Sequence, residues 1–138
     1  KIALFSSDSA SLSKTTTVYT APSSANAVPT NTLEVSQSQT DGGSSNTGYT
    51  AGGAALTPSA DPVLSSDTAC VKFNDVSFTS ATFTARGCLL YNSTAVTGFT
   101  TNRSVFSINF GADKTVTSGT FTVQFPAQTA GNAIVQIA

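Results

Sequence analysis

The sequence predicts an all-β protein, an antiparallel β-sandwich or jelly roll with extended Ser/Thr-rich loops or an arm in its first half. Serine and threonine supply 20 and 23 of the 138 residues. From Ala69 onward, apolar and polar residues alternate with a period of two, and short turn clusters separate the alternating stretches. No stretch combines helical periodicity with capping residues. This length fits one domain, so we expect a single β domain over residues 1–138.

The first half, residues 1–68, is predicted to be polar and rich in loops. Residues 1–5 have the pattern of a strand, and three short β-like stretches follow at 15–20, 32–36 and 49–57. Low apolar content cannot offset the entropy of ordering such a chain. We therefore expect a neighbour to order this half, either the second half or another copy of the protein.

The second half, residues 69–138, is predicted to form the regular strands and most of the core. Alternation predicts strands at 69–73, 76–78, 82–92, 103–110, 120–125 and 133–137. Two of these strands have one apolar face, formed by Phe106, Ile108 and Phe110 and by Phe121, Val123 and Phe125. We expect residues 111–119 to join these two strands as the loop of a hairpin.

The predicted strand 82–92 is apolar on both faces at its C-terminal end. Cys88 and Leu90 face away from the side that carries Leu89, so this end is either sandwiched between layers or faces another subunit. Arg86, in the same strand, either serves an interface or carboxylate contact or lies at an edge with its stem on apolar surface. The candidate interface residues are Arg86, Cys88, Leu90 and Tyr49.

The composition argues against an enzyme. Histidine is absent, which excludes Ser-His, Cys-His and His-metal arrangements. The carboxylates lie mostly beside Gly, Ser, Pro or Asn, where such side chains cap turns, and they are Asp8, Glu34, Asp41, Asp61, Asp67, Asp75 and Asp113. A calcium site drawing on Asp61, Asp67, Asn74 and Asp75 is the weaker alternative. The glycine clusters 41–43 and 48–53 lack the lysine and helix of a phosphate-binding loop. We expect no catalytic residue, cofactor or metal.

Charge and cysteine content limit the partners. The formal charge is −1, so we expect neither a nucleic acid nor an anionic membrane as a partner. No apolar run approaches the roughly 20 residues that span a bilayer. Because residue 1 is Lys, we expect the numbering to start inside a longer gene product or after disordered residues. Cys70 and Cys88 are too few for a disulfide scaffold, and we expect two buried thiols.

Several segments resemble a family of small structural proteins in the virions of tailed bacteriophages. The segments occur in the same order as in that family and span residues 48–137, about two thirds of the chain. They are GYTAGGAALT at 48–57, ATFTAR at 81–86 with LYNS at 90–93, and NRSVFSINFGADK at 102–114, continued by GTFTVQFP at 119–126 and IVQI at 134–137. The Ser/Thr-rich insert at 37–47 departs from shorter connections in the family and is expected to be an arm or an exposed loop.

The resemblance implies a non-enzymatic component of the virion, a capsid decoration or cement protein that bridges coat subunits. Its partner would be the major capsid protein, and we expect a homotrimer at a three-fold junction. The protein would be made in the host cytoplasm and located on the capsid surface. The alternative is a receptor-binding, adhesin-like domain of a tail or fibre, for which the aromatic candidates in a glycan pocket are Tyr49, Tyr91 and Phe99.

Overall fold

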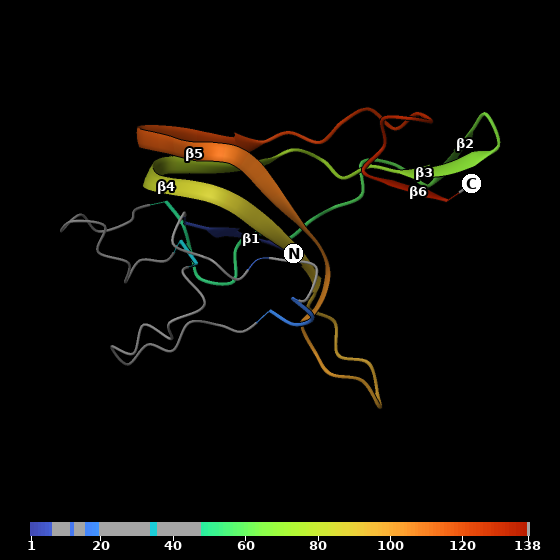
Figure 1. Ribbon diagram of the computed structural model, residues 1–138, viewed down its shortest axis with the longest axis horizontal. Coiled ribbons are helices and arrows are strands. Elements are labelled where there is room, and N and C mark those ends of the chain that lie inside the picture. The colour runs from blue at the N-terminus through green and yellow to red at the C-terminus, as the bar shows by residue number, and fades with distance from the viewer. Residues whose placement is uncertain (7–11, 13–15, 20–33, 36–47, 138) are drawn as a thin grey trace. The chain divides into compact units, whose positions relative to one another are not determined.

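Six β-strands make up the regular structure of the described residues, which are 1–6, 12, 16–19, 34–35 and 48–137 of a computed structural model (Figure 1). The strands are β1 (Ile2–Phe5), β2 (Val63–Ser65), β3 (Thr68–Val71), β4 (Val76–Asn92), β5 (Arg103–Val123) and β6 (Val135–Ile137). They form two antiparallel sheets in the orders β1-β4-β5 and β2-β3-β6, and none of the described residues is helical. The prediction of an all-β fold is confirmed, while the choice between a sandwich and a jelly roll stays a prediction.

The chain forms two compact units, and each takes segments from both halves of the sequence. Unit 1 comprises Lys1–Ala54 and Phe78–Thr120, and unit 2 comprises Ala55–Ser77 and Phe121–Ala138. Described residues of the first half therefore pack with the second half, which is one of the two neighbours expected for them. The expected single domain over 1–138 stays a prediction, and the predicted arm at 37–47 lies outside the described residues.

Strands β4 and β5 are longer than the sequence predicts. The hairpin loop predicted at 111–119 is wrong, because these residues continue β5. Gly111 and Ser118 lie within the strand and adopt left-handed backbone conformations, with φ of 78° and 49°. Such residues form local irregularities in a long strand. Strand β5 lies next to β4 in the sheet, and side-chain hydrogen bonds between Ser77 and Thr122 and between Thr84 and Thr115, both 2.9 Å, link the two strands. The connection between the paired strands is the loop 93–102 instead.

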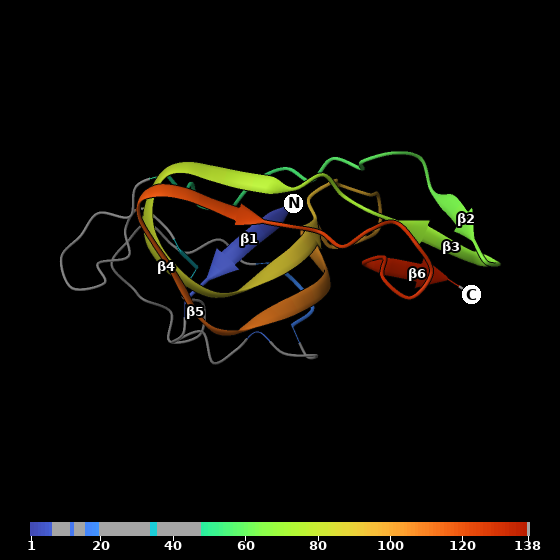
Figure 2. The same ribbon diagram turned by 90° about the horizontal axis from the view of Figure 1, so that it is seen from above.

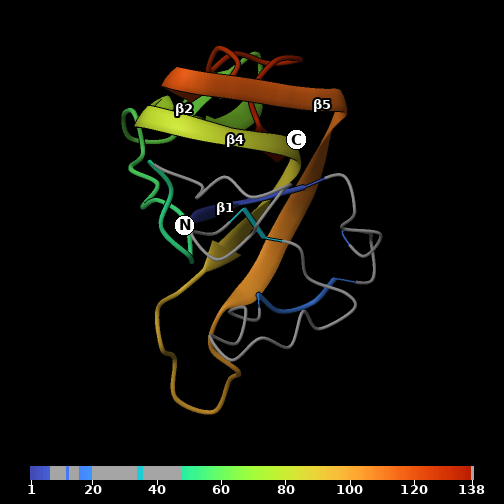
Figure 3. The same cartoon turned by 90° about the vertical axis from the view of Figure 1, so that its left-hand side faces the viewer.

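A left-handed residue also interrupts the alternation of β4. In a regular strand, Phe78 and Phe83 would point to opposite faces. Ser80 has a φ of 51°, and the two phenyl rings instead lie edge to face with centroids 6.2 Å apart. The ribbon of β4 and β5 curls back on itself, with β1 inside the curl (Figures 2 and 3).

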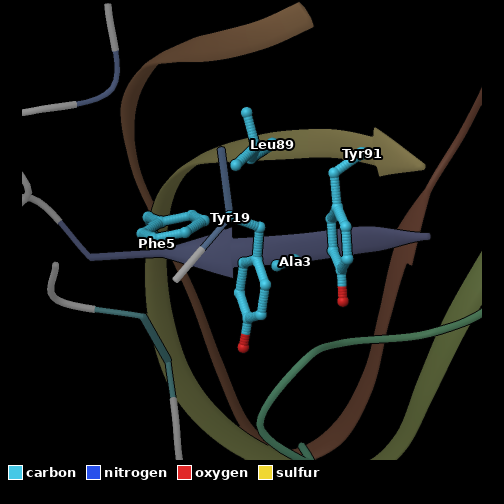
Figure 4. Packing of buried hydrophobic residues seen from close by; sticks show 5 residues of the cluster. All are labelled: Ala3, Phe5, Tyr19, Leu89 and Tyr91. Carbon is cyan, nitrogen blue, oxygen red and sulfur yellow. The ribbon is translucent and has the colours of Figure 1, made fainter. Parts of the chain in front are cut away.

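Both faces of β1 are buried in unit 1. Ile2 pairs with Leu90 and Leu4 with Cys88, and all four side chains are buried. The apolar end of β4 is therefore sandwiched between layers, the first of the two alternatives left open by the sequence. The opposite face carries a second cluster, shown in Figure 4, whose members are Ala3, Phe5, Tyr19, Leu89 and Tyr91.

Unit 2 contains the short sheet of β2, β3 and β6. The strands predicted at 69–73 and 133–137 are confirmed in shorter form, whereas β2 was not predicted. Ser66 and Asp67 join β2 to β3 with φ of 47° and 63°, the pair of positive values that a type I′ hairpin turn requires. Elsewhere in unit 2, the rings of Phe73 and Phe125 pack edge to face.

Candidate functional site

A buried carboxylate, Glu34, lies at the centre of a hydrogen-bond network in unit 1. Its side chain is 1% exposed. One oxygen accepts from the Tyr19 hydroxyl at 2.8 Å, and the other accepts from the Tyr49 hydroxyl and the Gly52 N–H, both at 2.7 Å. A buried carboxylate is costly unless it is hydrogen-bonded. These three donors offset part of that cost.

The network extends through the tyrosines to β1 and β4. The backbone N–H of Leu4 donates to the Tyr49 hydroxyl at 2.9 Å, and the Tyr91 hydroxyl donates to the Gly52 carbonyl at 2.7 Å. The rings of Tyr19 and Tyr91 are stacked with centroids 4.4 Å apart, and their hydroxyls point the same way in Figure 4. Glu34 thus joins segments that are far apart in the sequence.

Burial alters the acidity of these groups. Desolvation raises the pKa of Glu34, although the hydrogen bonds from Tyr49, Tyr19 and Gly52 lower it in part. Desolvation, together with the nearby Glu34, raises the pKa of Tyr91 to about 12 and raises the pKa of both Tyr19 and Tyr49 still further. The tyrosines therefore stay protonated and act as hydrogen-bond donors, which suits a structural network rather than proton transfer to a substrate.

Three of the four candidate interface residues lie inside unit 1. Tyr49, Cys88 and Leu90 are buried, and the Tyr49 ring packs against Phe78 and Phe83. Arg86 is partly exposed, and its guanidinium lies 3.5 Å from the Asp113 carboxylate. Arg86 thus makes the carboxylate contact that the sequence suggested, within its own chain. An interface through these four residues stays a prediction, and its exposed member is Arg86.

The two cysteines are buried free thiols, as the sequence predicts. Cys70 lies in unit 2 and Cys88 in unit 1. Burial raises the pKa of Cys88 to about 12. A thiol with this pKa is almost entirely protonated at neutral pH and is a poor nucleophile.

One face of the sheet in unit 2 is apolar and open. Leu64 pairs with Ala69, and Ala69 pairs with Ile137, so the three side chains form a row across the sheet. Val71 pairs with Val135 in the next row on the same face. Leu64 is 74% exposed and Ile137 is 71% exposed. Large apolar side chains grouped on an exposed surface are typical of an interaction site.

A small pocket lies beside the loop that joins β4 to β5. Its volume is about 110 Å³, and it is lined by Asn92, Thr94, Val96, Phe99, Thr100 and Arg103. The Arg103 guanidinium lies over the Phe99 ring, 4.7 Å from its centroid. Of the three aromatic residues that the sequence offers for a glycan pocket, Phe99 is 60% exposed, whereas Tyr49 and Tyr91 are buried.

The other carboxylates that the structure describes do not gather into a metal site. Within the described ranges, no group of three or more His, Cys, Asp or Glu side chains could hold a metal ion. Asp75 instead accepts a 2.9 Å hydrogen bond from the backbone of Phe125, and Asp67 forms the β2–β3 turn. The described residues also contain no helix that is long and apolar enough to cross a membrane.

Comparison with known proteins gave no relative: no family model, curated protein or solved structure matches the chain. The resemblance to virion proteins therefore stays a prediction.

Sequence reasoning missed the role of Glu34 and the open face of unit 2. The sequence pattern places Glu34 among the carboxylates that cap turns, whereas the structure buries its side chain. Glu34 is the one Glu of the chain and lies between Leu33 and Val35. No aspartate has a large aliphatic residue on both sides, so this setting is the available signal. Leu64 lies in β2, and the sequence does not predict this strand because three residues after Pro62 show little alternation.

Proposed function

We propose that this chain is a non-enzymatic structural protein of a virion, a capsid decoration or cement protein that bridges and stabilises coat subunits. The observation that supports it best is the open apolar face of unit 2, formed by Leu64, Ala69, Val71, Val135 and Ile137. A face of this kind stabilises a complex when another protein covers it. The partner we propose is the major capsid protein.

The chemistry of unit 1 fits this role. Its one deeply buried carboxylate among the described residues is enclosed by tyrosines and backbone, so it is out of reach of a substrate. The side chains that would be reactive, Cys88 and Tyr49, are buried and held protonated by a raised pKa. Unit 1 thus provides a stable support rather than a reaction site.

Repetition on a lattice would strengthen a modest contact. A trimer presents three copies of the same face, and linked contacts bind with an avidity far above that of one contact. We propose a homotrimer at a three-fold junction of the capsid. Native mass spectrometry should detect the trimer, and the finding of monomer alone, both in solution and released from particles, would contradict it.

The copy number in purified virions tests the proposed location. Quantitative mass spectrometry should give a ratio to the major coat protein near one, or a simple fraction such as about one third. A ratio below about one in twenty would place the chain on the tail, and its absence from the virion would remove the proposal altogether.

A second function, that of a receptor-binding domain on a tail or fibre, is favoured by one specific observation. The pocket beside loop 93–102 presents an exposed aromatic ring next to a guanidinium and several hydroxyl and amide groups. A low copy number would favour this function over the first.

A further inference from the structure

The loop between β4 and β5 is organised before any ligand binds. The Thr94 N–H donates to the Asn92 side chain at 2.9 Å, and the Phe99 N–H donates to the Val96 carbonyl at 3.0 Å, so a turn closes at each of these points. At the end of the loop, the Asn102 carbonyl accepts a 2.8 Å hydrogen bond from the Tyr19 N–H. A preformed loop loses little entropy when it binds a ligand.

The pocket beside this loop carries an arginine that is held in place. The Arg103 guanidinium lies over the Phe99 ring, 4.7 Å from its centroid, in a cation–π contact that favours this position of the charge. In the described part of the chain Arg103 has no carboxylate within ion-pair distance, whereas Arg86 is paired with Asp113. A guanidinium presents a fork of N–H donors whose geometry matches a carboxylate. The charge of Arg103 is thus available to an anionic ligand.

The remaining lining residues narrow the class of ligand. Asn92, Thr94 and Thr100 supply amide and hydroxyl groups, and Phe99 and Val96 supply apolar surface. A volume of about 110 Å³ is well below the roughly 300 Å³ of a typical small-molecule site, so the pocket suits part of one small residue. An acidic sugar combines the required features, because it has a carboxylate, several hydroxyls and an apolar C–H face.

We propose that the pocket formed by Asn92, Thr94, Val96, Phe99, Thr100 and Arg103 binds an acidic sugar residue, with its carboxylate on Arg103 and its C–H face on Phe99. This site uses other residues than the proposed capsid contact, and it rests on the second proposed function, that of a receptor-binding domain. The failure of this proposal therefore leaves the proposed capsid contact standing.

Titration of the full chain with sodium glucuronate, followed by backbone NMR shifts, tests the site. Glucuronate should shift the resonances of residues 92–103 and bind at least about tenfold more tightly than glucose, because glucose lacks the carboxylate. Arg103→Gln should remove this preference. Arg86→Gln is the matched control and should keep it, because Arg86 lies outside the pocket.

Several outcomes would overturn the proposal. They are equal binding of glucose and glucuronate, shifts outside residues 92–103, and no shift up to about 50 mM glucuronate. Acetate binding as tightly as glucuronate would show a carboxylate site without sugar recognition, and tighter binding of a tetraglutamate peptide would assign the pocket to an acidic peptide. The comparison of glucose with glucuronate uses the unmodified protein, so it stands even if Arg103→Gln does not fold.

Discussion

Strand β1 of unit 1 and the short sheet of unit 2 differ in how far their apolar residues are buried. In unit 1, β1 is buried on both faces, and even the carboxylate of Glu34 is enclosed and hydrogen-bonded. In unit 2, a sheet of three short strands leaves Leu64 and Ile137 largely exposed. The difference indicates that unit 1 gains its stability within the chain, whereas one face of unit 2 is suited to a contact with another protein.

The largest loss of stability is expected for a substitution at Gly53, which packs against the backbone of β1. Gly53 has a φ of 64°, and a Cβ there would lie 1.8 Å from the Ile2 carbonyl oxygen. Gly53→Ala should therefore lower the free energy of unfolding by at least about 4 kcal/mol, or prevent folding, because the backbone of β1 would have to move. Urea denaturation measures this loss.

Gly98→Ala is the matched control for that substitution. Gly98 also has a positive φ, 83°, but a Cβ there would meet nothing within 4 Å. The cost should be only that of the backbone conformation, about 1 kcal/mol. Equal losses in the two variants would contradict the view that close packing around β1 limits position 53.

Two leucines, one in each unit, should respond differently to truncation. Leu89 is 1% exposed in the cluster of unit 1, and Leu89→Ala should cost about 3 kcal/mol through lost burial and the cavity left behind. Leu64→Ala should change the stability of the isolated protein by less than about 0.5 kcal/mol, because the side chain is already in solvent. Thermal unfolding of both variants and the unmodified protein measures the two losses of stability. A large loss for Leu64→Ala would mean that its face is covered within the isolated protein.

Replacement of Glu34 should reveal the unsatisfied donors around it. Glu34→Leu keeps a similar volume but leaves the hydroxyls of Tyr19 and Tyr49 and the Gly52 N–H without their acceptor, at a cost of about 2 kcal/mol or more. Glu34→Gln retains a carbonyl oxygen for Tyr49 and Gly52, so it should cost less. Urea midpoints at pH 5 rank the three proteins, and the account fails if the leucine variant is as stable as the glutamine variant.

The smallest predicted effect is a dependence on pH. Burial raises the pKa of Glu34 above its ordinary value of 4.5, so the folded state binds this proton more tightly than the unfolded state does. The contribution to stability is complete below pH 4.5 and is lost as the pH rises through the folded-state pKa. Subtracting the stability of Glu34→Gln at each pH isolates this contribution. If the stability of the unmodified protein relative to Glu34→Gln instead increases with pH, the fold stabilises the charged form of the Glu34 carboxylate.

The sequence predicts the fold class and the apolar faces better than it predicts connections and buried polar groups. Alternation located Phe121, Val123 and Phe125 on one face, and the exposure of their neighbours agrees. Gly111 and Ser118 were interpreted as signs of a loop, because the same residues that form turns can also be accommodated as irregularities in a long strand. Ser66-Asp67 was missed as a hairpin turn because it lacks the Asn-Gly or Asp-Gly signal.

The candidate sites are formed largely by contacts between residues that are far apart in the sequence, and local sequence patterns do not predict such contacts. Cys88 and Leu90 were correctly identified as unusual, but their pairing with Ile2 and Leu4 decides that they are buried in this chain. Glu34 meets donors from residues 19, 49 and 52, and Leu64 joins Ile137 only through β3. Phe99 and Arg103 are close in sequence, yet their stacking depends on the turn at 96–99.

We propose that the open face of unit 2 attaches the chain to a capsid. The most direct measurement is the occupancy of Leu64→Ser/Ile137→Ser on purified capsids that lack the protein, compared with the unmodified chain by co-sedimentation and mass spectrometry. The account predicts that the double variant keeps its unfolding midpoint but loses most of its binding, because only the exposed row has changed. Full occupancy by a folded double variant would contradict it.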